Sequence, residues 1–160
     1  MMVSFGTFSQ TKFGFVDSQK LMDTMPSRIV ALEKLQAHEK QLINDLKTLQ
    51  ADIQKLEEDY QKNLPNMSLV VRQAAEKKLQ EKHNQFQTSQ QSSQEELQAY
   101  GEELNNPILD RIEKAIAIVA ERQKLTMVVD KSSTLFHAAD MDITKLVAVE
   151  LMKLEKEVKN

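Results

Sequence analysis

The chain of 160 residues contains no cysteine and no tryptophan, only three glycines and three prolines, and 5% aromatic residues. The lack of cysteine excludes disulfide bonds, a thiolate nucleophile and Cys-ligated zinc or iron–sulfur sites. The scarcity of glycine and proline argues against sandwiches, β-barrel enzymes and dinucleotide-binding folds, because all of these need many turns. What remains, with 16 glutamines and 28% charged residues, is the composition of long helices around a modest core.

Charge and hydropathy exclude further classes. The net charge of −3 argues against general binding to nucleic acid. No apolar stretch approaches the 18 residues that a membrane span needs, so we expect none. Residues 1–11 lack the basic start and apolar run of a signal peptide, which fits either removal or replacement of an export signal.

The three prolines predict where helices begin, because proline is tolerated in the first turn of a helix and disrupts its interior. We expect helix starts near residues 26, 66–68 and 107, with Thr24, Asn66 or Ser68, and Asn106 as N-caps. Segments 26–63 and 67–104 have equal lengths, which predicts a helical hairpin reversing at Pro65, with arms of roughly 57 Å. One long helix kinked at Pro65 is the alternative.

The two arms of this hairpin have unequal apolar seams. The first arm follows the 4-3-4 spacing of a coiled coil at Leu42, Leu46, Leu49, Ile53, Leu56 and Tyr60. The same spacing on the returning arm selects Leu79, His83, Phe86, Gln90, Ser93, Leu97, Tyr100 and Leu104, of which three are polar. We therefore expect the middle of the hairpin to be loosely packed.

Outside the hairpin the pattern predicts short strands at 11–17, 125–130 and 134–138, and amphipathic helices at 107–124 and 143–158, the last capped by Asp142. Segments 12–25 and 107–160 then form a β-containing body, and 26–106 the hairpin arm. Such a small body is marginal alone and its sheet has two open edges, so we expect oligomerisation. The core and subunit interface are predicted at Phe13, Phe15, Ile112, Ile116, Val128 and Val129.

Motifs that carry chemistry are missing. The sequence has no phosphate-binding glycine loop, no G-x-S-x-G and no H-E-x-x-H. The histidines His38, His83 and His137 fall on three different segments, and the acidic run 57–59 points to different faces of a helix. We therefore predict no catalytic residues, no metal site and no cofactor, and a protein that is not an enzyme.

Several short motifs resemble the Skp/OmpH family of periplasmic chaperones. They are Phe13-Gly14-Phe15-Val16-Asp17-Ser18-Gln19-Lys20 followed by Met25-Pro26, then Asn106-Pro107-Ile108-Leu109-Asp110-Arg111-Ile112, Leu125-Thr126-Met127-Val128-Val129-Asp130 and Asp142-Ile143-Thr144. The order of strand, short helix, long out-and-back helices, strand pair and last helix is also similar. The resemblance runs from Lys12 to the end of the chain.

The resemblance implies a mainly α fold with a small β body, in which a long antiparallel hairpin projects from a short-stranded sheet. Three subunits would build a β-barrel body, and their hairpins would enclose unfolded outer-membrane proteins in the periplasm without ATP. Two departures matter. Residues 26–104 hold ten Lys and Arg against thirteen Asp and Glu, so we do not expect contact with lipopolysaccharide or membrane. Gln123-Lys124 also stands where relatives commonly have glycine.

Client contacts are predicted at the hairpin tip and on one arm, at Leu64, Met67, Leu69, Val70, Val71 and Phe86. The tip residues either close the tip against each other or face the client, and Phe86 either packs in the seam or contacts the client. Two other functions stay open, a structural coiled-coil adaptor and a cytosolic prefoldin-like chaperone. Prefoldin places its strands between its two helices, whereas here they lie at the outer ends.

Overall fold

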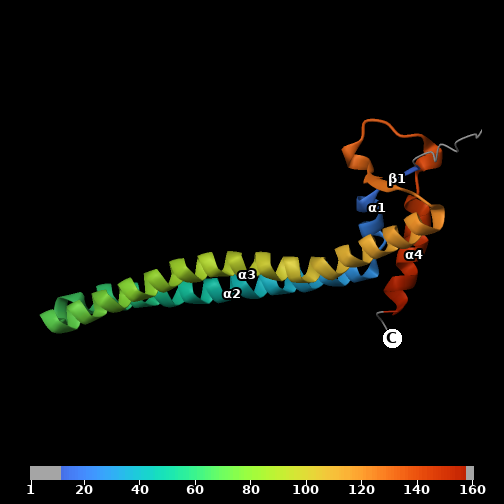
Figure 1. Ribbon diagram of the computed structural model, residues 1–160. Helices are drawn as coiled ribbons and strands as arrows, with labels where there is room; N and C mark the ends of the chain where they lie inside the picture. Colours follow the sequence, from blue (N-terminus) through green and yellow to red (C-terminus); the bar gives the residue numbers. More distant parts are fainter. Residues whose placement is uncertain (1–11, 158–160) are drawn as a thin grey trace, which may run out of the picture. The chain divides into compact units, whose positions relative to one another are not determined.

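The computed structural model describes residues 12–157. In chain order these form β1 (Phe13–Val16), α1 (Ser18–Asp23), α2 (Pro26–Asn63), the 3-10 turn η1 (Leu64–Asn66), α3 (Leu69–Gln123), β2 (Met127–Asp130), the 3-10 turns η2 (Lys131–Ser133) and η3 (Ala139–Met141), and α4 (Thr144–Glu157), as Figure 1 shows. Contacts divide the chain into two compact units. We call Leu32–Leu104 the hairpin, and the described residues before and after it the body.

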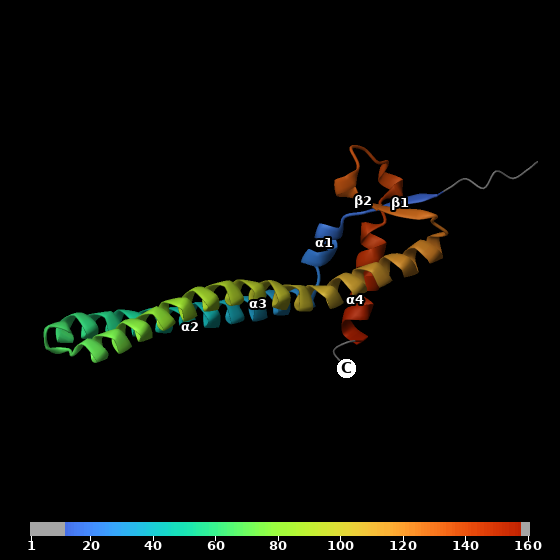
Figure 2. The ribbon, with the colours of Figure 1, turned by 60° about the vertical axis from the view of Figure 1, so that its left-hand side comes forward.

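In the hairpin, α2 and α3 lie side by side and run antiparallel (Figures 1 and 2). The chain reverses at η1, where Pro65 occupies the first turn and Met67 returns to extended backbone with ψ of 133°. The Ser68 hydroxyl accepts a hydrogen bond from the Val71 amide over 3.4 Å, which caps the start of α3. The hairpin and its reversal are confirmed, and the alternative of one kinked helix is wrong.

The seam of the first arm is confirmed: Ile53 is buried, and Leu42, Leu46, Leu49, Leu56 and Tyr60 are half-buried. On α3 the predicted seam is wrong at two positions. His83 and Gln90 are exposed, and Lys82 and Ser89 take their places. Within the hairpin, the half-buried positions of α3 are Ala75, Leu79, Lys82, Phe86, Ser89, Ser93, Leu97, Tyr100, Gly101 and Leu104. Because the side chains between Phe86 and Leu97 are polar, apolar periodicity cannot fix the helix rotation there.

The helix predicted to start at Pro107 is instead part of α3, which runs without interruption from Leu69 to Gln123 with Pro107 inside it. A proline in a helix interior removes one hydrogen bond and costs about 3 kcal/mol. The residues that follow offset this cost, because Ile108, Ile112, Ala115 and Val119 are buried in the body. Packing of the amphipathic face therefore overrides the break that proline alone predicts.

The body contains a parallel pair of strands. β1 and β2 align Phe13 with Met127 and Val16 with Asp130, and Figure 2 shows them side by side. The amide of Ile143 extends the pairing by donating to the carbonyl of Phe15 over 2.9 Å. The third strand predicted at 134–138 is wrong, because this segment is irregular between η2 and η3.

The core of the body lies where α1, the end of α3 and α4 meet. Its largest fully buried side chains are Leu21, Met25, Val119, Val147 and Leu151. Gly14 packs closely beside this core, because a Cβ there would lie 2.6 Å from Leu125 Cδ1 and 3.3 Å from Ile143 Cδ1, so the Leu125 side chain would have to move. Within residues 12–157, no helix combines the length and the apolar composition needed to cross a membrane.

The end of α3 has the backbone that glycine usually provides. Lys124 adopts a left-handed conformation with φ of 55°. Its amide donates to the Glu121 carbonyl and the amide of Leu125 donates to the Ala120 carbonyl, over 3.0 and 2.9 Å. This pair of bonds is the Schellman motif that ends many helices, and its left-handed residue is most often glycine. The Gln123-Lys124 pair, which stands where relatives commonly have glycine, therefore still forms this turn.

Candidate functional site

The tip of the hairpin presents apolar side chains to solvent. Leu69, Val70 and Val71, which we call the tip patch, are 69%, 74% and 52% exposed. They form the first turn of α3, directly after the reversal. Leu64 and Met67 are half-buried and close the turn. The structure therefore separates the five tip residues into two that complete the reversal and three that remain available.

Phe86 does not join this patch. It is half-buried in the seam and lines an open groove of about 340 Å³ together with Ile53, Glu57 and His83. It also lies 17 residues after Leu69, which is about 25 Å along a helix. Phe86 therefore lies in a different region of the hairpin from the other five candidate client residues.

The middle of the hairpin is poorly filled, as the sequence predicts. Leu42, Leu46 and Leu49 of α2 face Ser89 and Ser93 of α3, and a groove of about 400 Å³ opens between them. A second groove of about 280 Å³ opens along the other flank of the seam. Serine is too short to cover a leucine from the facing helix, so the leucines stay partly accessible. The hairpin thus offers weak apolar contact area along its middle as well as at its tip.

Polar contacts between α2 and α3 border this region. The Tyr60 hydroxyl donates to Glu76 over 2.6 Å near the tip, and this hydrogen bond raises the pKa of Tyr60. His83 Nε2 lies 2.9 Å from Glu57 Oε1, and His38 Nε2 lies 2.9 Å from Glu96 Oε1. The His38 ring also lies against the Tyr100 ring, with centroids 4.8 Å apart.

The predicted body residues divide between core and surface. Ile112 is buried, Phe15, Ile116, Val128 and Val129 are half-buried, and Phe13 is 42% exposed. Phe15 stacks on His137 with ring centroids 5.1 Å apart. The strands therefore keep apolar side chains at the surface of the body.

Two strongly exposed side chains were not among the predicted interface residues. Leu135 and Phe136 are 108% and 85% exposed, in the segment between η2 and η3. Their signal in the sequence was the strand prediction at 134–138, which identified an apolar segment but gave it the wrong structure. The body therefore keeps two adjacent apolar side chains exposed in this segment.

Buried carboxylates in α4 were also missed, because acidic residues in a helix usually indicate an exposed face. Glu155 is 4% exposed, and accepts hydrogen bonds from the Ser27 amide over 3.0 Å, from the Ser27 hydroxyl over 2.8 Å, and from Arg111. Burial alone would raise the pKa of Glu155, but these donors outweigh it and hold the pKa below its usual range. The ion pair joins α4 to the part of α3 that lies in the body.

Two aspartates fasten the ends of the strands. Asp130 accepts hydrogen bonds from the amides of Ser132 and Ser18, over 2.8 and 3.1 Å, and from the Ser18 hydroxyl. Hydrogen bonding by the Ser132 and Ser18 side chains, with smaller contributions from their amides, holds the pKa of Asp130 well below the usual range. Burial would raise the pKa of Asp142, but Lys131 at 2.5 Å and the Thr144 amide at 2.9 Å outweigh it and lower the pKa. These contacts connect β2, α1 and α4, and they give both carboxylates a structural role.

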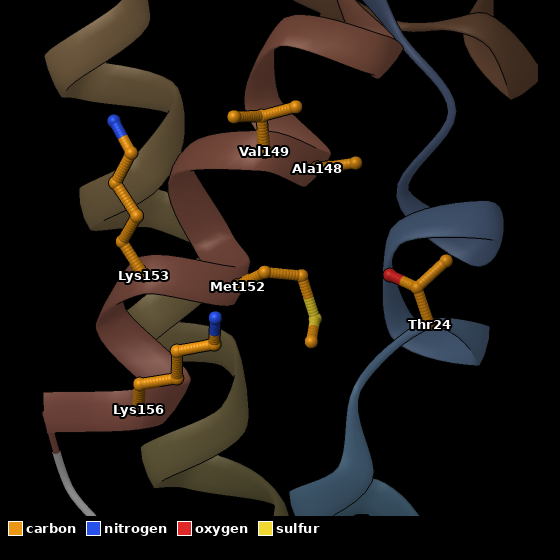
Figure 3. Close-up of a pocket in the computed structure, with 6 residues that line it drawn as sticks. All are labelled: Thr24, Ala148, Val149, Met152, Lys153 and Lys156. Carbon is orange, nitrogen blue, oxygen red and sulfur yellow. The ribbon is translucent and has the colours of Figure 1, made fainter.

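An open groove of about 430 Å³ runs along α4, lined by Thr24, Ala148, Val149, Met152, Lys153 and Lys156. Figure 3 shows Met152 extending from α4 toward the chain segment that carries Thr24 after α1. Lys153 is paired with Glu150 over 3.1 Å.

Among residues 12–157, no three His, Asp or Glu side chains converge as a metal site would require.

Comparison with known proteins decides the family. A family model described as "Outer membrane protein (OmpH-like)" matches residues 12–151. The chain belongs to the OmpH-like family. Two relatives of this OmpH-like chain are named chaperone protein Skp. The protein from Photorhabdus laumondii is 24% identical over 144 residues, which cover 90% of this chain and 87% of that protein. The protein from Pectobacterium atrosepticum is 25% identical over 133 residues, covering 83% and 81%.

A solved structure supports the same fold. A Caulobacter crescentus protein, described as a candidate OmpH-like outer membrane chaperone, superposes with a TM-score of 0.79 at 16% identity, over 96% of this chain and 90% of that one. The resemblance inferred from the short motifs is confirmed, and so is the mainly helical fold with its small sheet. This likeness shows that the OmpH-like chain shares the fold of that protein, with long helices and a small sheet.

Proposed function

We propose that this OmpH-like protein is a holdase, which keeps unfolded outer-membrane proteins from aggregating in the periplasm without ATP and without catalysing a reaction. The observation that carries the proposal is the tip patch, three adjacent apolar residues left exposed on a chain of this family. Folded monomers seldom leave such side chains together in water unless they bind something. An unfolded outer-membrane protein presents the complementary apolar segments.

The grooves in the middle of the hairpin extend this surface. Leu42 and Leu46 line two of them and are only half-covered by the serines of α3. Each apolar group buried from water contributes about 25 cal/mol per Å². Several shallow contacts of this kind give useful affinity in total, while each one breaks quickly. Such binding releases a client without fuel, which fits a sequence that has no nucleotide-binding motif.

We further propose that the protein acts as a homotrimer whose strands join across subunits. The sheet has two strands in the described part of the chain, so β2 has an unpaired edge. Exposed apolar side chains also lie on both strands and after η2, namely Met127 on β2, Phe13 on β1, and Leu135 and Phe136. Strands at an open edge pair readily with another chain. The arms carry a net charge of −3, so lipopolysaccharide and membranes are not proposed as partners.

Suppression of client aggregation tests the proposal. A urea-unfolded outer-membrane β-barrel protein is diluted into buffer with increasing amounts of the chaperone, and light scattering gives the concentration for half-suppression. Replacing residues 69–71 by serine should raise this concentration about tenfold, since 1.4 kcal/mol of lost apolar contact corresponds to that factor. The mass of the complex is measured in parallel, because the trimer should persist.

The matched control replaces Ile29, Val30 and Leu32 by serine, since these are 58%, 47% and 54% exposed and similar in size to the tip patch. The control should suppress aggregation like the wild type. Equal suppression by the tip variant and the wild type would reject the tip as a client contact. A wild-type protein that leaves aggregation unchanged would reject the holdase function itself.

A further inference from the structure

The outer side of α4 carries lysines and apolar residues. Residues three or four apart lie on the same side of a helix. On this side lie Lys145, Leu146, Val149, Met152, Lys153 and Lys156, which we call the α4 face. Met152 is half-buried, and the other five residues are exposed. The open groove of about 430 Å³ follows the second half of this face, and apolar side chains gathered along a groove are typical of a binding surface.

The charges of α4 are divided between its two sides. Glu150 and Glu155 are buried, and each pairs with an arginine of α3. The three lysines of α4 are exposed, and no ion pair among the described residues includes Lys145 or Lys156. The remaining acid of α4 is Glu157, its last residue. The α4 face is therefore positively charged, although the whole chain has a net charge of −3.

The walls of the groove combine apolar atoms with ammonium groups. On the α4 side, Val149 and Met152 lie on successive turns (Figure 3). The opposite wall contains Thr24, whose hydroxyl already donates to the Leu21 carbonyl over 2.7 Å. Both charged side chains that line the groove are lysines, although Lys153 also pairs with Glu150. An occupant must therefore supply apolar side chains and negative charge.

The spacing of the α4 face indicates a helical occupant. Its apolar residues lie between Lys145 at one end and Lys153 and Lys156 at the other. From Lys145 to Lys156 the helix rises by roughly 16 Å, which is about three turns. A second helix that lies along this face repeats its apolar residues at the same interval of three or four positions. Carboxylates in the first and last turns of that helix would lie over the lysines.

A polypeptide fits the α4 face better than a membrane surface does. The face borders a groove, whereas a helix that lies on a bilayer presents a convex apolar side. Such helices also anchor themselves with aromatic side chains, and the α4 face contains none.

We propose that the α4 face is a docking site for an acidic amphipathic helix of another protein. Apolar side chains of this partner lie in the groove against Val149 and Met152, and its carboxylates pair with the lysines at both ends. The site uses no residue of the tip patch, so it is a second binding surface, separate from the proposed client contact.

Fluorescence anisotropy tests the proposal with a synthetic probe. The probe is a fluorescein-labelled helical peptide with Glu in its first and last turns and Leu one turn apart between them. The wild-type protein should bind it, and sodium chloride should weaken this binding because salt screens exposed charges. A second peptide with Lys in place of every Glu should bind about tenfold more weakly, because several ion pairs are lost.

Variants of the α4 face locate the binding. Lys153→Gln with Lys156→Gln should raise the Kd of the acidic peptide about fivefold, since an exposed ion pair contributes a factor of about two to three. Val149→Ser should raise it by about the same factor through lost apolar contact. These side chains are exposed, so the body should stay folded. The matched control, Lys12→Gln with Lys114→Gln, removes two exposed lysines elsewhere on the body and should leave the Kd unchanged.

Four outcomes would overturn the proposal. The first is no binding of the acidic peptide to the wild type, and the second is equal binding of both peptides. The third is a change in the mass of the protein on Val149→Ser, which would make the face a contact between copies of this chain. The fourth is sedimentation with phosphatidylglycerol vesicles that the acidic peptide does not reverse, which would make it a membrane contact. No client is used, so the result is independent of the holdase function.

Discussion

The buried carboxylate of Glu155 provides a quantitative test of how the body is held together. Arg111→Ala removes the cation beside this carboxylate and leaves only the amide and hydroxyl of Ser27 as donors. Removing one partner of a buried ion pair lowers the free energy of unfolding by about 3–5 kcal/mol, because the other charge stays buried without its partner. Since two donors stay in place, we expect a loss of about 3 kcal/mol in the stability of the body.

Hydrogen exchange is the appropriate assay, because both tyrosines of the chain lie in the hairpin and report little on the body. Amides in the buried faces of residues 108–119 and 147–154 should exchange roughly a hundredfold faster in the variant, since each 1.4 kcal/mol is a factor of ten. Protein concentration is kept constant, because association stabilises the folded state. Arg111→Met, which keeps the apolar stem, should behave like Arg111→Ala.

The pH dependence distinguishes charge from packing. The pKa of Glu155 lies below its usual range in the folded protein, so its contribution to stability is present above the pKa of the unfolded chain and is lost as pH falls through the folded pKa. The difference between wild type and Arg111→Ala should therefore shrink from pH 7 toward pH 3. A difference that stays constant at acidic pH, or that is under tenfold at pH 7, would refute the ion-pair explanation. Arg122→Ala is the matched control, because Arg122 is 55% exposed and Lys153 remains on Glu150.

Two further substitutions test the turn after α3 and the subunit interface. Lys124→Gly should stabilise the body by about 1 kcal/mol, because a side chain in the left-handed region is strained; slower exchange of the α3 amides measures this, and faster exchange would contradict it. Val129→Asp should dissociate the proposed trimer, since it places a charge on β2 opposite Phe15. Sedimentation gives the mass, and a variant that still sediments as a trimer would remove Val129 from the interface.

The sequence predicts the hairpin well, because the signals there are local. Pro26 marks the start of α2, Pro65 lies in the reversal, and the leucine spacing of α2 identifies the face that packs. Where apolar residues are sparse, the same logic fails. His83 and Gln90 fit the spacing of the seam, but the facing leucines are contacted by the neighbouring positions. A one-residue rotation costs little when either choice buries only polar atoms.

The body was less predictable, because long-range contacts decide its structure. Pro107 is tolerated inside α3 since the residues after it are buried. Segment 134–138 has the residues of a strand but no partner within the described chain, and Phe136 stays in solvent. The burial of Glu155 depends on Arg111, which is 44 residues away in sequence, so no local pattern could reveal it. The client residues at the tip and on Phe86 remain predictions.

The parallel pairing of β1 with β2 has a consequence for how the chain folds. Phe13 cannot find Met127 until more than a hundred residues between them have been made, so this pairing closes a very long loop. Closing it from an extended chain is slow, because the entropy must be lost before any contact repays it. Helices α2 and α3 need only local contacts, and once they have packed together they remove most of the intervening residues from the effective loop. We therefore expect the arms to form early in folding and the sheet to assemble last.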